Sequence, residues 1–279
     1  MNVQLLLVPY DSGHRGWRCG AGPEHLLRAG LQRHLERQRH VVTGVQVLED
    51  DPAKRSAEIR TAFELARRLA YAVRSARAAG DFPLVLSGNC NAAVGTLSGI
   101  SPAERAVFWF DAHGDCNTPE TTTTGFLDGM GLTTALGLCW RDLAATVPGF
   151  EPVLPRMSFL LGARDLDPAE ASWLEQSEVT SIPVGQVPDG LPMLLEQAPV
   201  ADAIGYVHLD LDVLDPSVGR ANYLPVPQGL SLEQLTGAIA AVRGRVPLAA
   251  ATVASYSPEE DHDQGICRAA FAAITALLA

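Results

Sequence analysis

The stretch RAVFWFDAH, residues 105–113, is a nearly unbroken apolar run that ends in an aspartate and a histidine. Continuous apolar runs, unlike alternating ones, are typical of strands that are buried on both faces of a parallel sheet. Other runs of this kind cover residues 3–9, 40–48, 82–88, 157–163, 203–214 and 247–256. Helix-like segments separate several of them, and this alternation predicts an α/β fold in which helices cover both faces of a parallel sheet.

The helix-like segments are identified by the spacing of their apolar residues and by their ends. Apolar residues recur at i, i+3 and i+4 across residues 56–80, which finish on a glycine. Residues 231–245 begin with Ser231 and carry Gln234 three positions later, which is the spacing of a capping box. A chain of 279 residues, 47% of them hydrophobic, without repeats or low-complexity tracts, fits a single domain over residues 1–279.

The overall charge narrows the classes of partner. The formal net charge is −11, which argues against a nucleic-acid partner, because phosphates call for a basic surface. The first apolar run lacks a basic flank and is too short for a signal or membrane helix, so no membrane partner is expected. The five cysteines are odd in number and irregular in spacing, which predicts no disulfide framework and a reducing, cytoplasmic location.

Charged side chains gather where two of the predicted strands end. Asp111, His113 and Asp115 recur at a spacing of two, so in an extended segment they project to one face. Asp210 and Asp212 share a face in the same way at the end of another run. In parallel sheets ligands bind beyond this edge. Four carboxylates and one imidazole need an offsetting charge there, and the ligand mix predicts two Mn²⁺ or similar ions.

Cys90 lies in SGNCN, residues 87–91, at the end of a third predicted strand. Free cysteines are most often small buried hydrophobic residues, so a packed thiol is the simplest interpretation. The position beside the Asp and His groups favours a metal ligand instead. A metal-free nucleophile is a third interpretation, but it needs a partnering base and leaves the converging Asp and His groups unexplained.

Several longer segments resemble one known family. They are DAHGDCNTPETTTTGFLDGMG (111–131), LDLDVLDPS (209–217), SGNCN (87–91), LGARDLDPAE (161–170), GAGP (20–23) and ASYSPEED (254–261). Taken in chain order, and over essentially the whole chain, they resemble the motifs of the arginase and agmatinase family, the ureohydrolases. The resemblance implies a single domain with a parallel sheet of about eight strands between layers of helices. It also implies a hydrolase acting on the C–N bonds of linear amidines, with a small guanidino amino acid as substrate.

The resemblance also assigns metal ligands. Asp111 and Asp210 would bridge two manganese ions, and a hydroxide held between the ions would attack the guanidino carbon. The remaining ligands would be Cys90 and Asp115 for one ion and His113 and Asp212 for the other. Because a thiolate is a softer ligand than an imidazole, Zn²⁺ or Fe²⁺ is not excluded. Family relatives are often trimers or hexamers, so an oligomer is possible.

The substrate positions divide into those that match the family and those that depart from it. The matching positions are Asn117, Thr124 and Asp167, which would hold the α-carboxylate and α-amino groups of an amino acid. The departures are Cys90 for a ligating histidine, Asn89 for an aspartate, Asp128 for a proton-shuttling histidine, Phe126 for an asparagine, Leu224 for a threonine and Ser255 for the glutamate that pairs with the guanidinium.

The departure at Ser255 suggests a less cationic substrate. A serine opposite a guanidinium forfeits a charge-assisted hydrogen bond of about 1.5–3 kcal/mol. N-hydroxylation makes a guanidine a much weaker base, so we expect Nω-hydroxy-L-arginine as substrate, giving hydroxyurea and ornithine. The alternatives are an arginase, an agmatinase- or guanidinobutyrase-like hydrolase, or a metal-poor relative without activity.

Other residues near these motifs have more than one interpretation. Asp128 is either a general acid, if burial raises its pKa, or the N-cap of a helix beginning DGMG. His208 lies on the same strand face as Asp210, and a hydrogen-bonded core histidine is favoured over a site-supporting one. Cys116 and Cys19 are expected to pack as core thiols. Glu120 and Asp165 are expected to support the site from outside it.

Overall fold

An eight-stranded sheet runs through the middle of the computed structural model, which describes residues 1–51, 53, 57–100, 104–200 and 202–279. Every pair of neighbouring strands in it is parallel. From one edge to the other, the strands are β4 (Val41–Val47), β1 (Asn2–Val8), β5 (Phe82–Ser87), β10 (Leu248–Ala254), β9 (Ile204–Asp210), β6 (Arg105–Phe110), β7 (Ser158–Leu161) and β8 (Thr180–Ile182). The predicted parallel α/β sheet is confirmed.

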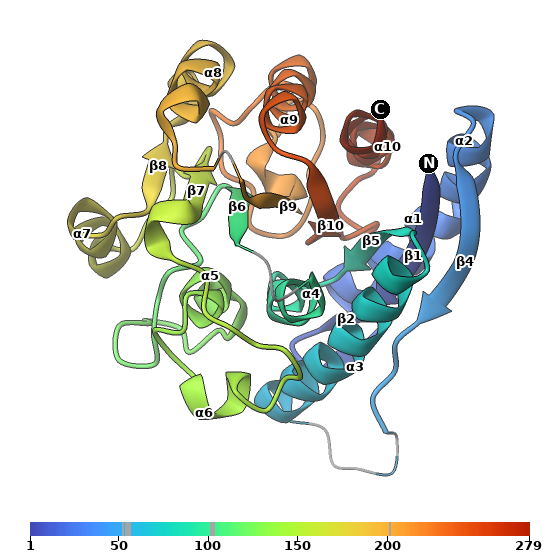
Figure 1. The fold of residues 1–279 in the computed structure, drawn as a ribbon, viewed down its shortest axis with the longest axis horizontal. Coiled ribbons are helices and arrows are strands. Elements are labelled where there is room, and N and C mark those ends of the chain that lie inside the picture. Colours follow the sequence, from blue (N-terminus) through green and yellow to red (C-terminus); the bar gives the residue numbers. More distant parts are fainter. Residues whose placement is uncertain (52, 54–56, 101–103, 201) are drawn as a thin grey trace.

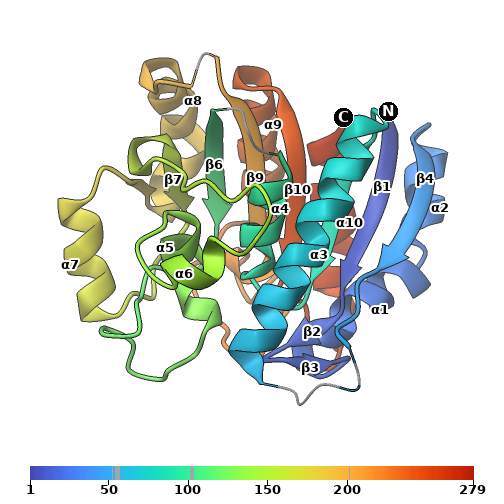
Figure 2. The same cartoon turned by 60° about the horizontal axis from the view of Figure 1, so that its bottom comes forward.

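Helices form a layer on each face of this sheet (Figure 1). One layer contains α3 (Glu58–Ala78), α4 (Ala92–Ile100), α5 (Gly131–Ala135) and α6 (Arg141–Ala144). The other contains α2 (Leu31–Arg37), α8 (Val187–Gln197), α9 (Leu232–Arg245) and α10 (Gly265–Leu278). Figure 2 shows the first layer in front of the strands. No helix in the described part of the chain is long and apolar enough to cross a membrane.

Short elements complete the chain. Two short α-helices are α1 (Gly22–Arg28) and α7 (Pro168–Gln176). A two-stranded sheet is formed by β2 (Tyr10–Asp11) and β3 (His14–Arg15). The 3-10 helices are η1 (Arg18–Ala21), η2 (Asp128–Met130), η3 (Pro155–Met157), η4 (Val184–Gln186) and η5 (Leu211–Val213).

The predicted elements correspond closely to the observed ones. Each predicted apolar run contains or overlaps a strand of the eight-stranded sheet. The sequence did not predict β8, which is short and partly exposed, or the two-residue strands β2 and β3. The predicted helix over residues 56–80 is α3, and Ser56 lies outside the described residues. The capping box before α9 is confirmed, because Ser231 and Gln234 accept each other's backbone N–H groups.

Two predicted strands end earlier than expected, at Phe110 and Asp210. The reason is the same at both ends. Asp111 Oδ1 accepts the backbone N–H of His113 at 2.8 Å, and Asp210 Oδ1 accepts that of Asp212 at 2.8 Å. An aspartate that binds the N–H two residues later bends the chain into a turn. The expectation that strand alternation aligns these groups was therefore wrong, since turns bring them together.

Candidate metal centre

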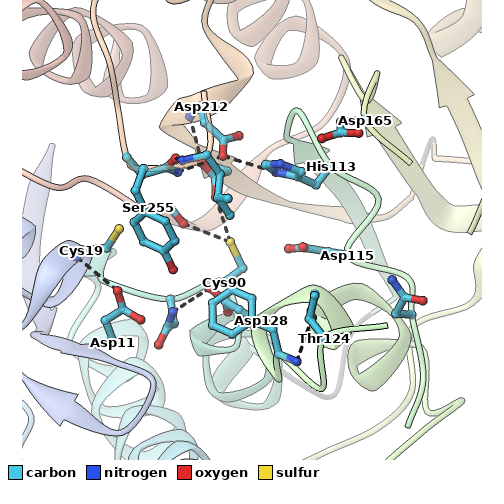
Figure 3. Close-up of a pocket in the computed structure, with 18 of the residues that line it drawn as sticks. Asp11, Cys19, Cys90, His113, Asp115, Thr124, Asp128, Asp165, Asp212 and Ser255 are labelled. Carbon is cyan, nitrogen blue, oxygen red and sulfur yellow. Dashed lines mark hydrogen bonds and ion pairs between the residues drawn. The ribbon is translucent and has the colours of Figure 1, made fainter. Parts of the chain in front are cut away.

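A polar pocket lies at the carboxyl edge of the central strands β5, β10, β9 and β6 (Figure 3). All site residues predicted from the sequence line it except Asp111, which is buried beside His113. The carboxyl ends of neighbouring parallel strands meet at one edge of a sheet, so residues from distant motifs meet there. The pocket is therefore assembled from segments spread over most of the chain.

Cys90 points into the middle of this pocket (Figure 3). Its Sγ donates to Asp210 Oδ2 at 3.1 Å and lies 3.5 Å from Ser255 Oγ. Burial, followed by the nearby carboxylates of Asp128 and Asp210, raises the pKa of the thiol well above its ordinary value. Without a cation the group is a neutral thiol surrounded by acids. Because the raised pKa keeps the thiol protonated, this environment does not activate Cys90 as a nucleophile. The sulfur lies beside Asp210, among the metal ligands predicted from the sequence.

The aspartates around Cys90 are too close and too buried to be anions together without a cation. Burial and the neighbouring carboxylates raise the pKa of Asp111, Asp115 and Asp210. The Oδ2 atom of Asp115 is buried and has no hydrogen-bond partner among the described residues. A buried carboxylate oxygen without a partner is costly unless something absent from the chain itself binds it.

His113 partly supplies the missing positive charge. Its Nδ1 lies 3.4 Å from Asp111 Oδ1 and 3.3 Å from Asp212 Oδ2. Burial lowers its pKa, but the charges and hydrogen bonds of Asp212 and Asp111 outweigh burial and raise it to about 12. For Asp212, burial raises the pKa, but the attraction of His113 outweighs burial and lowers the pKa to about 2. The protonated imidazole of His113 therefore takes the place of a metal cation in the ion-free chain.

The donor atoms fit divalent cations. Cys90, Asp111 and His208 each offer one ligand atom within 4.8 Å of the others, and so do Asp111, His113 and Asp212. Asp111 belongs to both groups. Carboxylate oxygen, imidazole nitrogen and thiolate sulfur together suit first-row divalent metals. The unpartnered Asp115 oxygen and the raised carboxyl pKa values agree with the same conclusion.

Asp128 lies on the opposite side of Cys90 from His113 in Figure 3. Its carboxylate accepts from Asn89 Nδ2 at 2.7 Å and from the backbone N–H of Asn91 at 2.9 Å. Burial raises its pKa to about 7. The predicted N-cap of its own helix was wrong, because Asp128 is the first residue of η2 and makes no cap bond there. Its carboxylate instead binds Asn89 and Asn91, which lie just before α4.

Two departures from the family pattern form one pair. An amide at position 89 donates to the carboxylate at position 128. An aspartate at position 89, as in the family motif, would place two carboxylates within hydrogen-bond distance and repel Asp128. Gly88 makes this turn possible, because a side chain there would collide with the backbone carbonyl of Tyr10.

The other end of the pocket has a different hydrogen-bond pattern. Asn117 Nδ2 donates to Asp167 Oδ2 at 2.9 Å, and Thr124 Oγ1 accepts the backbone N–H of Phe126 at 3.2 Å. Asp167 is the N-cap of α7 and forms a capping box with Glu170. These polar side chains face the pocket and are held by bonds to each other and to a helix end.

Some supporting residues were predicted and others were missed. Asp165 lines the pocket, whereas Glu120 does not and instead accepts the hydroxyl of Thr118 at an exposed site. Cys116 packs in the hydrophobic core, as predicted. Cys19 is also buried, but it lines the pocket, so the expectation that it only packs was incomplete.

Asp11, Asn222 and Tyr223 line the pocket but were not identified from the sequence. Asn222 Nδ2 donates to Asp212 Oδ2 at 2.9 Å and so orients a predicted ligand. Asp11 follows β1, so its place after a strand of a parallel sheet was a usable signal. Asn222 and Tyr223 lie in a loop without a comparable pattern.

His208 lies beneath the metal-ligand candidates in the middle of the sheet. It is fully buried, and its ring stacks on Trp109 with centroids 3.8 Å apart. Its Nδ1 lies 3.2 Å from the hydroxyl of Tyr206. Burial lowers its pKa to about 3, so the ring is neutral. The predicted hydrogen-bonded core histidine is confirmed for Nδ1, but Nε2 has no partner among the described residues.

Comparisons with known proteins agree with this fold. A family model described as "Arginase family" matches residues 1–279. The arginase of Bacillus caldovelox is 31% identical over 248 residues, which cover 83% of this chain and 83% of that protein. A crystal structure of arginase from Bacillus subtilis matches with a TM-score of 0.88 at 26% sequence identity, covering 100% of this chain and 98% of that chain.

Proposed function

Because the chain belongs to the arginase family of hydrolases that act on guanidino C–N bonds, we propose that it is a dimetal amidinohydrolase for Nω-hydroxy-L-arginine. The products are hydroxyurea and L-ornithine. The observation that carries the proposal is the environment of Ser255, whose hydroxyl lies 3.5 Å from the Cys90 sulfur in the pocket. Ser255 occupies the position where the family motif has the glutamate that pairs with a guanidinium.

Six side chains would hold two Mn²⁺ ions. Asp111 and Asp210 would bridge them, with Cys90 and Asp115 on one ion and His113 and Asp212 on the other. The membership of Asp111 in both ligand groups supports its bridging role. When bound, the ions would supply the positive charge that makes a water molecule acidic enough to attack at neutral pH. The thiolate softens its end of the centre, so Zn²⁺ or Fe²⁺ remains a competing metal.

The chain's own groups fix the ligand positions. Trp109 Nε1 donates to Asp111 Oδ2 at 3.1 Å, and Asn222 Nδ2 donates to Asp212 Oδ2 at 2.9 Å. The backbone N–H of Ala112 also donates to Asp212, at 3.2 Å. Groups that bind ligand carboxylates in this way set their orientation and their basicity. The carboxylates are therefore oriented before any ion arrives.

Ser255 and Asp128 would handle the head group of the substrate. A neutral hydroxyguanidine needs hydrogen bonds but no counter-charge, so a serine hydroxyl suits it better than a carboxylate. In the reaction a water oxygen bonds to the guanidino carbon, the bond from that carbon to Nδ breaks, and Nδ takes up a proton. Asp128, with a pKa raised to about 7, holds a proton for this step near neutral pH.

Asn117, Thr124 and Asp167 would hold the amino-acid end of the substrate. All line the pocket, and Asn117 and Asp167 already bind each other. This end favours an α-amino acid over a decarboxylated guanidine such as agmatine. The combination of this amino-acid end with Cys90 resembles the Nω-hydroxy-L-arginine amidinohydrolase of D-cycloserine biosynthesis. We therefore place the reaction in antibiotic biosynthesis, in the cytoplasm, where the free cysteines stay reduced.

Hydrolysis of L-arginine itself is the second candidate, because the similar proteins named above are arginases. The two activities make opposite demands on position 255. A cationic guanidinium buried beside a serine lacks a charged partner, whereas the hydroxylated group does not need one. A metal-poor relative without activity is the weakest candidate, because the ligand atoms converge despite the cysteine.

Metal dependence and product analysis test the proposal. The purified chain is stripped with a chelator, reloaded with Mn²⁺, and assayed with Nω-hydroxy-L-arginine, L-arginine and agmatine. We expect no turnover after stripping, and recovery of ornithine together with hydroxyurea after reloading. Full activity without metal contradicts the dimetal centre. Turnover of no guanidino compound contradicts the enzyme assignment.

A further inference from the structure

A chain of buried polar groups runs from α4 through β10 and β9 to His208. Thr96 Oγ1 donates to the carbonyl of Ala92 at 3.1 Å and lies 3.2 Å from Thr252 Oγ1. The hydroxyl of Tyr206 donates to Thr252 Oγ1 at 2.8 Å and lies 3.2 Å from His208 Nδ1. Thr96, Thr252 and His208 are fully buried, and so is Tyr206.

The direction of these hydrogen bonds favours one tautomer of His208. A carbonyl only accepts, so the one hydroxyl proton of Thr96 goes to Ala92, and Thr252 must donate to Thr96. Tyr206 then donates to Thr252, and its oxygen is left to accept from His208. The Nδ1 atom therefore carries the ring proton, and Nε2 presents an unshared electron pair.

The ring that carries this electron pair lies next to the candidate metal centre. Nε2 of His208 is buried and has no hydrogen-bond partner among the described residues. The ring offers a ligand atom within 4.8 Å of those of Cys90 and Asp111. Stacking on Trp109 at an interplanar angle of 24° holds the ring in place.

The neighbours of Nε2 cannot donate a proton to it. The single thiol proton of Cys90 is used toward Asp210 Oδ2 at 3.1 Å. Once Cys90 and Asp111 act as ligands, both are anions without a proton. An imidazole that donates from Nδ1 to an oxygen and leaves Nε2 facing anions has the arrangement of a metal ligand.

We propose that His208 is a ligand of the ion held by Cys90 and Asp115, in addition to the six ligands of the proposed function, on which this inference rests. The family motif has a histidine ligand at position 90, where this chain has Cys90. His208 in β9 would supply the imidazole for that ion instead. That ion then has nitrogen, sulfur and oxygen ligands, while the other ion keeps His113 as its imidazole.

X-ray absorption of the full chain loaded with two equivalents of Mn²⁺ counts the bound imidazoles. We expect two imidazoles for the two ions, from His113 and His208. The variants His208→Asn and His113→Asn should each leave one, and the double variant none. Counting in the unsubstituted chain does not depend on any variant folding. Two bound ions with one imidazole overturn the role of His208 and leave the dimetal centre intact, whereas failure to bind ions overturns the dimetal centre itself.

The variant Tyr206→Phe tests whether His208 is a metal ligand that Tyr206 positions or only a ring packed in the core. This variant removes only the oxygen that accepts from His208 Nδ1. Loss of such a supporting bond weakens metal affinity by about 10–100-fold. We expect chelator competition to give weaker binding of one ion while the imidazole count stays at two. Unchanged affinity for both ions in both Tyr206→Phe and His208→Asn contradicts the proposal.

Discussion

The two ends of the pocket differ in how closely they follow the arginase pattern. At the end that we propose holds the amino-acid part of the substrate, Asn117 and Asp167 resemble the family motif, and Asn117 donates to Asp167 at 2.9 Å. At the head-group end, Cys90, Asp128 and Ser255 all depart from it, and they lie close together around one sulfur. These three departures are therefore gathered where the reacting group of the substrate would lie, whereas Phe126 departs beside Thr124 at the other end.

The difference teaches that the departures at the head-group end contact one another. Asn89 and Asp128 are both departures, and the two are linked because the Asn89 amide donates a hydrogen bond to the Asp128 carboxylate. Ser255 and Cys90 are likewise within 3.5 Å of each other. A framework that retains the amino-acid end and replaces the head-group end fits a change of head group on the same amino acid.

The largest expected effect comes from removing the carboxylate charge of Asp210, a proposed ligand of both ions. In Asp210→Asn we expect loss of bound metal and a fall in kcat/KM of about 1,000-fold or more, because the ions supply several kcal/mol. Asp215→Asn is the matched control, since Asp215 belongs to the same motif but binds the backbone N–H groups of Ser217 and Gly229. Metal content equal in the two variants contradicts the assignment of Asp210.

Asp128→Asn tests the head-group end without removing a ligand. If Asp128 delivers the proton to the leaving nitrogen, kcat should fall by about 100-fold with little change in KM. Its pKa is raised to about 7, so the protonated form is lost as pH rises through that value. The corresponding fall in kcat with rising pH should disappear in the variant. A variant with unchanged kcat would leave Asp128 only a structural role before α4.

Ser255→Glu should move the head-group end back toward arginine. A restored charge-assisted hydrogen bond of about 1.5–3 kcal/mol should raise kcat/KM for L-arginine, relative to Nω-hydroxy-L-arginine, by about 10–100-fold. Ser255→Gln has nearly the same shape without the charge and should not do so. The backbone at Ser255 has φ of 62°, and this conformation is common to both variants, so it does not affect the comparison between them. An equal change in both variants contradicts the charge argument.

Metal loading should depend on pH through His113. Its pKa is raised to about 12 in the ion-free chain, so an ion must displace a proton at neutral pH. Each displaced proton makes the affinity rise about 10-fold per pH unit. Titration calorimetry in buffers of different ionisation enthalpy measures the protons released. Affinity that does not change between pH 6 and pH 8, roughly the range in which ligand protons compete with metal, would contradict the His113 ion pair.

Asn117→Ala tests the amino-acid end and should have the smallest effect. We expect KM for L-arginine and Nω-hydroxy-L-arginine to rise together by about 10-fold, because one polar contact to the α-carboxylate is worth roughly 1–1.5 kcal/mol. The ratio of the two substrates should stay constant, which separates this end from position 255. A change in that ratio would show that the two ends are not independent.

The sequence was sufficient for the parts of the site that follow from strand order. Asp111 and Asp210 could be placed together because parallel strands end at one edge. The turns that bring in His113 and Asp212 depend on side-chain hydrogen bonds to the backbone, which apolar patterning does not report. The free nitrogen of His208 depends on Thr96 and Thr252, which are far apart in the sequence, so only the three-dimensional structure reveals it.

The ratio of kcat/KM for Nω-hydroxy-L-arginine to kcat/KM for L-arginine, measured on the Mn²⁺-loaded chain, tests the central claim most directly. The serine at position 255 and the retained amino-acid end predict a ratio well above one, on the order of 10–100, from the charge-assisted bond that arginine lacks. A ratio below one, with L-arginine the better substrate, would contradict the claim that the head-group end suits a neutral, hydroxylated guanidine.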